Sequence, residues 1–374
     1  MSLYGDLDKC AGKFYNPKRL LTFNKPWNFI TGSRSVGKST GWAIYCVLDF
    51  LHNGHKFIYV RRTKDEVSLT APTFFGNAVP IIRNNTCYLI DEIRYTKQKF
   101  YIVYKHENED GEIEEELVEC GMSIPLSLEQ KYKSANLSEY FNVIYDEFIA
   151  KNTSQYLGNS NTPDREYKAM LSLYQTIDRG IDKPYRNETK VFFLGNTATV
   201  YNPLFLSLGI AKYVTDNPGA KTINPKDKLW ILERIETVDA IKDIENSYAY
   251  QLADEEERAY AYENKGTESF DTSFISEPNI SVYDETFTLA GVDYGICHDA
   301  DYNYYIGKPN YKASLKRYSL DVESHNGIDL KLIHRMMQHP LTMYLHEAYL
   351  SGRLYFNNVR TKQEFLKYLQ FIPN

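Results

Sequence analysis

The sequence contains few cysteines, no long apolar run and no excess of basic charge, and each absence excludes a class of protein. Its five cysteines are scattered over 374 residues without a Cys-x-x-Cys pair, which argues against a disulfide framework and against a zinc site. No apolar run approaches the ~18 residues that a membrane span requires, and the N-terminus lacks the basic-then-apolar pattern of a signal peptide. A cytoplasmic protein without membrane contact is therefore expected.

Basic residues do not outnumber acidic ones: 43 lysines and arginines stand against 49 aspartates and glutamates, a formal charge of −6. A protein that coats nucleic acid usually carries a basic footprint. Any contact with nucleic acid should therefore be local, through a few lysines that line a channel, or indirect, through partners. The remaining composition, 43% hydrophobic and 25% charged, is that of a globular protein, and the length predicts two or three domains of roughly 150 residues.

The first part of the chain has the pattern of an α/β fold. A short apolar segment, 27–31, precedes a glycine-rich turn, a stretch with apolar residues at helical spacing, and a second strand, 56–62. Strand, helix and strand in this order predict a right-handed parallel unit. Two more short apolar strands are expected at 141–145 and 190–194, with a helix around 166–178 between them.

A β-hairpin is expected as an insertion within residues 87–124. Alternating residues flank Asp110-Gly111, a tight-turn signal. Its far arm carries several glutamates, which we interpret as a solvated face rather than an acidic docking surface. They are Glu112, Glu114, Glu115, Glu116 and Glu119.

The glycine-rich turn matches the phosphate-loop pattern G-x-x-x-x-G-K-[ST]. Backbone N–H groups of such a loop curl around phosphates, and glycines permit the close approach. Lys38 would reach the β- and γ-phosphates of ATP, and the Ser39 hydroxyl would bind Mg²⁺. The motif lies between a predicted strand and a predicted helix, whose N-terminal end would face the anion. The expected nucleotide-binding residues are Gly32, Ser33, Arg34, Ser35, Val36, Gly37, Lys38, Ser39 and Thr40.

A second ligand for Mg²⁺ is expected at the end of a neighbouring strand. Asp146 follows the strand 141–145, and Glu147 directly after it could polarise an attacking water. The alternative is a pair of surface acids that begin a loop. The pair favours a hydrolysing P-loop ATPase with a further strand between the two motif strands. Asn196, at the end of the strand 190–194, could sense the γ-phosphate or be an ordinary turn asparagine.

Several strings beyond these motifs resemble one family, the DNA-packaging ATPases of phi-29-like bacteriophages. The resemblance spans the whole chain, is strongest over 14–205 and is sparse between 206 and 320. It is carried by Phe14-Tyr15-Asn16-Pro17, FITGSRSVGKS, FIYVRR followed by Lys64, IPLSLEQKYKSAN, VIYDEF, LGNTATVYNPLF and YLSGRLYFNNV.

The resemblance implies a ring-shaped motor, a pentamer, that pumps double-stranded DNA into a preformed procapsid with ATP and Mg²⁺. Such a motor works in the host cytoplasm, docked transiently at the portal vertex. The implied partners are the DNA, the portal or connector protein and, in some members, a packaging RNA.

The resemblance also implies roles for individual basic residues. Arg179 resembles the family's arginine finger, which acts on a neighbouring subunit's nucleotide, although Arg186 is a nearby competitor. Lys64 and Lys133 match basic positions that face a neighbour's nucleotide or the DNA. Solvated surface lysine is the alternative for both of them.

The expected fold is an α/β P-loop NTPase of the RecA/ASCE type, with a parallel sheet flanked by helices. Changes in composition place domain boundaries near 205 and 275. The ATPase domain would cover 1–205, a linker or lid region 206–275, and an α+β C-terminal domain 276–374. By the resemblance, the last is an RNase-H or nuclease-like fold without cutting activity. Asp293, at a predicted strand end, could be a relic of a metal site, but no second acid is predicted to face it, so no nuclease activity is expected.

Two other functions stay open at this point. One is another P-loop motor, such as a helicase, although no additional strand-contact motif is found. The other is a nucleotide-gated assembly protein that binds ATP with little turnover. Glu147 argues against the latter, because a protein that only binds nucleotide needs no water-activating carboxylate.

Overall fold

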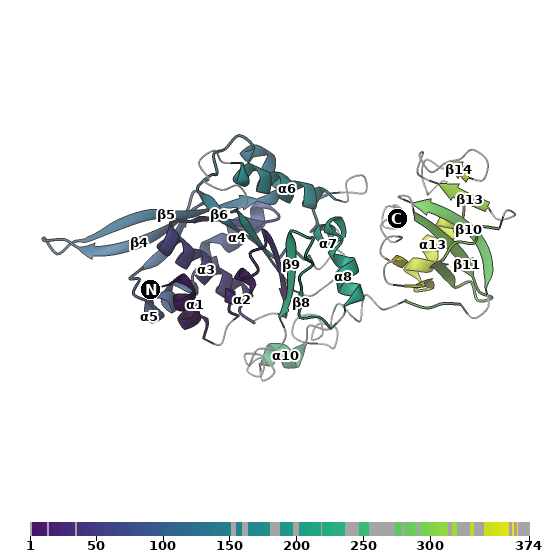
Figure 1. Cartoon of the computed structure of the whole chain (residues 1–374), viewed down its shortest axis with the longest axis horizontal. Coiled ribbons are helices and arrows are strands. Elements are labelled where there is room, and N and C mark those ends of the chain that lie inside the picture. The colour runs from purple at the N-terminus through teal and green to yellow at the C-terminus, as the bar shows by residue number, and fades with distance from the viewer. Residues whose placement is uncertain are drawn as a thin grey trace. The chain divides into compact units, whose positions relative to one another are not determined.

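In the computed structural model the chain divides into two compact units, residues 1–267 and 268–374, which we describe separately (Figure 1). The structure describes residues 2–12, 15–33, 36–150, 155–158, 164–179, 188–196, 202–217, 219–235, 247–253, 274–278, 281–289, 292–312, 316–319, 330–332, 340–358, 361–362 and 365.

A nine-stranded sheet forms the centre of the first unit, in the order β3-β4-β5-β2-β6-β7-β1-β9-β8. The six strands from β5 to β9 in this order are parallel, and antiparallel strands close both edges. The strands are β1 (Trp27–Gly32), β2 (Lys56–Arg61), β3 (Glu92–Thr96), β4 (Lys99–Glu107), β5 (Ile113–Pro125), β6 (Tyr140–Asp146), β7 (Lys190–Gly195), β8 (Thr222–Ile223) and β9 (Trp230–Ile235).

Helices cover both faces of this sheet (Figure 1). One face packs against α1 (Leu3–Ala11), α2 (Lys18–Leu21), α3 (Lys38–Asn53), α4 (Lys64–Phe74) and α5 (Ala78–Asn85). The other packs against the 3₁₀ segment η1 (Leu126–Tyr132), α6 (Arg165–Asp178), α7 (Pro203–Leu208) and α8 (Ile210–Asp216). Alternate residues of one strand enter the two cores, because successive side chains of a strand point to opposite faces. Phe57 and Tyr59 of β2 join the first core, whereas Ile58 and Val60 join the second.

The central strands are those that the sequence predicts. Their apolar runs are buried almost completely, as expected for parallel strands with both faces covered. In the sheet β7 lies between β1 and β6, with Phe29 opposite Phe193 and Ile144 opposite Phe192. The further strand expected between the two motif strands is therefore confirmed.

The predicted hairpin is formed by β4 and β5, which extend beyond the rest of the first unit (Figure 1). Gly111 closes the turn with φ of +77°, a conformation that L-residues with a Cβ rarely adopt. Glu112, Glu114 and Glu116 are exposed, and Glu115 pairs with Arg94 across the sheet. The solvated acidic arm is thus confirmed for these outer glutamates. Glu119 departs from it, because its half-buried carboxylate pairs with Lys56 and Lys99.

The boundary placed near 205 falls inside the first unit. β9 pairs with β1 along six residues, from Trp27 opposite Trp230 to Gly32 opposite Ile235. The polar composition of residues 206–275 hides this strand, because Glu233 and Arg234 interrupt its apolar run. Beyond β9 the structure describes only the short helix α10 (Tyr248–Leu252) before residue 274.

The second unit contains a six-stranded sheet in the order β14-β13-β10-β11-β12-β15. β10, β11 and β12 form an antiparallel meander, and β13 and β14 then add in parallel beside β10, which is an RNase-H-type arrangement. The elements are β10 (Val282–Leu289), β11 (Val292–His298), β12 (Tyr304–Gly307), β13 (Lys316–Ser319), β14 (Leu330–Leu332), α13 (Pro340–Leu350) and β15 (Leu354–Phe356).

The core of the second unit lies between this sheet and α13, with Phe287, Ile296, Ile306 and Leu345 fully buried. Asp293 on β11 accepts hydrogen bonds from the hydroxyls of Thr288, at 2.5 Å, and Tyr311, at 3.0 Å. In the described parts of both units, no helix is both long enough and apolar enough to cross a membrane.

Candidate nucleotide-hydrolysis site

The phosphate loop connects β1 to the N-terminus of α3. Gly37 has φ of +83° immediately before the helix starts at Lys38, so a residue with a Cβ would be strained there. Gly32 has a different reason to be glycine. A Cβ on it would lie 3.0 Å from Cβ and 3.1 Å from the carbonyl oxygen of Ile235 on β9. Arg34 and Ser35 lie outside the described residues.

The N-terminal string supports the loop from outside. Tyr15 N–H donates to the carbonyl of Val36 at 3.2 Å, and the Tyr15 hydroxyl donates to buried Glu233 on β9. A Cβ on Gly41 of α3 would meet the carbonyl oxygen of Tyr15 at 2.3 Å. The segment around Tyr15, the phosphate loop, the start of α3 and β9 therefore pack against one another.

Lys38 is buried inside the loop that it follows. Its Nζ donates to the carbonyl oxygens of Gly32 at 2.8 Å and Ser33 at 2.6 Å, and to Oδ1 of Asn196 at 3.3 Å. The end of β7 thus brings Asn196 to the loop lysine. That Asn196 senses the γ-phosphate stays a prediction.

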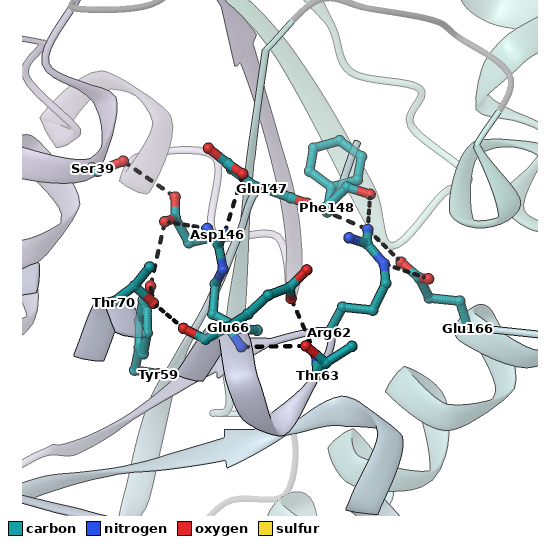
Figure 2. Close-up of polar contacts among 11 residues, drawn as sticks. Ser39, Tyr59, Arg62, Thr63, Glu66, Thr70, Asp146, Glu147, Phe148 and Glu166 are labelled. Carbon is teal, nitrogen blue, oxygen red and sulfur yellow. Dashed lines mark hydrogen bonds and ion pairs between the residues drawn. The ribbon is translucent and has the colours of Figure 1, made fainter. Parts of the chain in front are cut away.

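Ser39 and Asp146 come together although 107 positions separate them in the sequence. The Ser39 hydroxyl donates to Oδ1 of Asp146 at 3.2 Å, across the gap between the start of α3 and the end of β6 (Figure 2). Burial raises the pKa of Asp146, and the negative charge of Glu147 raises it further, while the Arg61 guanidinium opposes both. A cation placed between these oxygens would favour the ionised carboxylate.

Glu147 differs from Asp146 in exposure and in backbone conformation. Its side chain is 58% exposed, against 15% for Asp146. Its φ is +54°, so the chain turns sharply as β6 ends, and the next amide, of Phe148, donates to the carbonyl of Leu194 on β7 at 3.1 Å. This turn places an exposed carboxylate beside the largely buried one of Asp146. The water-activating role of Glu147 stays a prediction.

Arg61, at the end of β2, contacts both acids. Its Nη1 donates to Oδ2 of Asp146 at 2.9 Å and its Nη2 to Oε2 of Glu147 at 3.1 Å. Tyr59 from the same strand donates to Oδ2 of Asp146 at 3.4 Å. The sequence reasoning missed Arg61 as a site residue. In the sequence Arg61 was noted only as part of the string FIYVRR. It reaches the acids because β2 pairs with β6, and no local sequence pattern shows that pairing.

The remaining predicted residues lie at the surface of the single chain. Arg179 directly follows α6 as its C-cap, Lys64 begins α4, and Lys133 follows η1; all three are exposed. Arg186 lies outside the described residues. A role for any of them at a neighbouring subunit or on DNA stays a prediction.

A parallel sheet with a phosphate loop on β1, an Asp-Glu pair on β6 and β7 between them defines a P-loop NTPase of the additional-strand class. Residues 7–366 match the sequence profile of the family described as "Podovirus DNA encapsidation protein (Gp16)", and the chain belongs to this family. The expected fold class and the expected family are therefore confirmed. Membership in this family also confirms the expected function in viral DNA packaging.

Relatives and solved structures agree with this assignment. The chain is 26% identical over 355 residues to the DNA packaging proteins of Bacillus phage phi29 and Bacillus phage PZA, covering 92% of this chain and 93% of each relative. Its fold is similar to a chain of the bacteriophage Phi-29 genome packaging motor assembly, with a TM-score of 0.61, 23% identity and coverage of 95% and 99%. The Phi-28 gp11 packaging motor gives the same TM-score at 16% identity, with coverage of 97% and 99%.

Proposed function

We propose that this chain is an Mg²⁺-dependent ATPase that drives double-stranded viral DNA into a preformed procapsid. The observation that carries the proposal is the hydrogen bond between Ser39 and Asp146, which joins the start of α3, where Lys38 and Ser39 lie, to the end of β6, where Asp146 is followed by Glu147. A binding-only protein would need the first three of these groups but not an exposed carboxylate beside the metal ligand.

The residues present fit Mg²⁺. This ion keeps several waters and takes one or two protein oxygens together with phosphate oxygens. The Ser39 hydroxyl and the Asp146 carboxylate, already within 3.2 Å of each other, would supply the two protein ligands. When bound, the ion would neutralise charge on the β- and γ-phosphates.

The chain's own groups then have separate tasks. Lys38, held inside the loop, would bind the β- and γ-phosphate oxygens, and the loop N–H groups would cradle the phosphates. Glu147 would accept the proton of the attacking water and orient it towards the γ-phosphorus. Arg179 of a neighbouring subunit would add a cation to the spreading charge of the transition state, because its planar fork can bridge two phosphate oxygens.

The proposed assembly is a homo-oligomeric ring, a pentamer, at the portal vertex of a procapsid in the host cytoplasm. It includes the DNA and the portal protein, with a packaging RNA as a further candidate partner. The solved relatives with this fold are described as packaging motors, which supports an assembly of this kind. The exposed positions of Lys64, Lys133 and Arg179 are compatible with contacts to a neighbouring subunit or to DNA.

The test is whether ATP hydrolysis by the purified protein rises with duplex DNA and procapsids together. We expect little hydrolysis by the protein alone and a marked rise with both components. Activity stimulated by single-stranded DNA, accompanied by strand separation, would favour a helicase instead. Tight ATP binding with no turnover under any of these conditions would favour the nucleotide-gated assembly protein.

A further inference from the structure

Two adjacent arginines at the end of β2 reach opposite faces of the sheet. Arg61 contacts the side chains of Asp146 and Glu147, as described above. Arg62 turns to the other face, since successive side chains leave a strand in opposite directions. There its Nη2 donates to the carbonyl oxygens of Phe148 at 3.0 Å and Glu147 at 3.3 Å (Figure 2). One arginine therefore contacts the acids' side chains, and the other contacts the main chain that carries the second acid.

Glu166, in the first turn of α6, holds Arg62 in this position. The guanidinium donates twice to its carboxylate, from Nε at 2.9 Å and from Nη2 at 3.0 Å. The pair is buried, with side-chain exposures of 5% and 0%. Glu166 also accepts from the Tyr145 hydroxyl at 2.6 Å and from the N–H of Leu157 at 2.9 Å. A buried carboxylate with four donors has little freedom to move.

This network fixes a strained turn. Glu147 has the left-handed φ of +54°, which a residue with a Cβ adopts only when its surroundings enforce it. Its carbonyl is held by Arg62, and the following N–H is held by the carbonyl of Leu194 on β7. Burial alone would lower the pKa of Arg62, but Tyr145 and Glu166 raise it above its usual value, so the cation persists.

We propose that Arg62 and Glu166 are positioning residues for hydrolysis: they hold the main chain of Glu147 in the turn that directs its carboxylate to the attacking water. The pair also ties this turn to α6, whose other end carries Arg179 about 20 Å away along a 14-residue helix. This inference rests on the proposed role of Glu147. It adds two residues that touch neither nucleotide nor metal.

The test is a double-mutant cycle between Arg62→Lys and Glu147→Gln. Lysine keeps the charge but lacks the planar fork, so it cannot hold both Glu166 and the two carbonyls. We expect kcat to fall ~10- to 100-fold in Arg62→Lys, as for a reacting group displaced by about 1 Å. The KM for ATP should stay within about twofold, because the phosphate contacts of Lys38 are untouched. In the Glu147→Gln background the same substitution should change the residual rate by less than about twofold.

A purely structural role would give a different result. In that case Arg62→Lys would lower the residual rate of Glu147→Gln by the same factor as in the wild type, and such additivity would overturn the proposal. Asp49→Asn is the matched control. Asp49 is also buried and accepts from Asn142 at 2.6 Å and Asn53 at 2.7 Å, but near the opposite end of β6. It should lower Tm without lowering kcat.

A milder variant covers the case in which Arg62→Lys does not fold. Tyr145→Phe keeps both charges and removes only one donor to Glu166, and it should show the same non-additivity with a smaller loss, about two- to fivefold in kcat. Additive losses in this variant would equally overturn the proposal.

If the wild type itself showed no ATPase activity with DNA and procapsids, the proposed function would fail. An active wild type with additive losses would refute the positioning role alone.

Discussion

Replacing Glu147 by glutamine separates nucleotide binding from hydrolysis. Glutamine has the same shape and can still accept a hydrogen bond from Arg61, now 3.1 Å from the carboxylate, so the turn after β6 should be kept. What is lost is the ability to take a proton from water. Lys38, Ser39 and Asp146, which would bind ATP and Mg²⁺, keep their contacts.

The size of each effect follows from the exposure of the side chain. Because the Glu147 side chain is 58% exposed, its ion pair with Arg61 should be worth at most ~1 kcal/mol, and the stability of the fold should change little. A positioned general base contributes about 10²- to 10⁴-fold, which is ~2.7–5.4 kcal/mol of the activation barrier. Hydrolysis should therefore fall by that factor while the Kd for ATP changes by less than about threefold.

The assay combines single-turnover hydrolysis of radiolabelled ATP with binding of a fluorescent ATP analogue. Glu116→Gln is the control, since Glu116 is 64% exposed on the hairpin arm and lies outside the site. It should match the wild type in both measurements. Normal hydrolysis by Glu147→Gln would show that another group activates the water and would refute the assignment.

Three further predictions concern the loop lysine, the subunit interface and acid stability. Lys38→Ala should abolish measurable binding of the fluorescent ATP analogue, because the β- and γ-phosphates lose their cation; retained binding would contradict the role of Lys38. Arg179→Ala should bind ATP normally but hydrolyse it poorly, and mixing it with Glu147→Gln protein should restore part of the activity, because some interfaces then pair an intact Glu147 with an intact Arg179. No recovery at any ratio, with co-assembly demonstrated, would count against a finger acting in trans, and an equal loss in Arg186→Ala would move the role there. Burial opposes the charge on Asp49 and Asp6, but hydrogen bonds from His55 and Asn53 to the first, and from Lys9 and His52 to the second, leave both pKa values lowered in the fold. The stabilisation by these two carboxylates is present above the unfolded pKa of about 3.8 and is lost as pH falls through their lower folded pKa values. The urea concentration at the unfolding midpoint should therefore decrease at pH values below about 4, and it should decrease less in Asp49→Asn. Equal acid sensitivity of that variant and the wild type would contradict this cause.

The parts of the fold that the sequence predicts are those with a local signal. Asp110-Gly111 marks its hairpin, and Gly37-Lys38 marks the start of its helix, because each needs a particular backbone conformation at one position. The strand Trp230–Ile235 was missed, because Glu233 and Arg234 make it read as polar. Glu233 is nevertheless buried beneath the hydroxyl of Tyr15, a partner 218 positions away.

The residues of the candidate site also divide into those with a local sequence signal and those without one. Lys38, Ser39, Asp146 and Glu147 stand in motifs whose spacing follows from their chemistry. Arg61 and Arg62 occupy the end of an ordinary strand, and they reach the acids only because β2 pairs with β6. Glu166 lies in a helix whose periodicity gives no sign that one of its carboxylates is buried. Residues that act through long-range pairing leave no local pattern, so only the structure reveals them.

The measurement that tests the central claim most directly is packaging itself. Purified protein, procapsids, duplex DNA, ATP and Mg²⁺ are combined, and DNA that has entered the capsids is scored by its resistance to added nuclease. The account predicts protected DNA that requires ATP hydrolysis and is absent with Lys38→Ala or Glu147→Gln, while Glu116→Gln protein packages normally. Protection that persists without ATP, or that Glu147→Gln supports as well as the wild type, would contradict an ATP-driven motor.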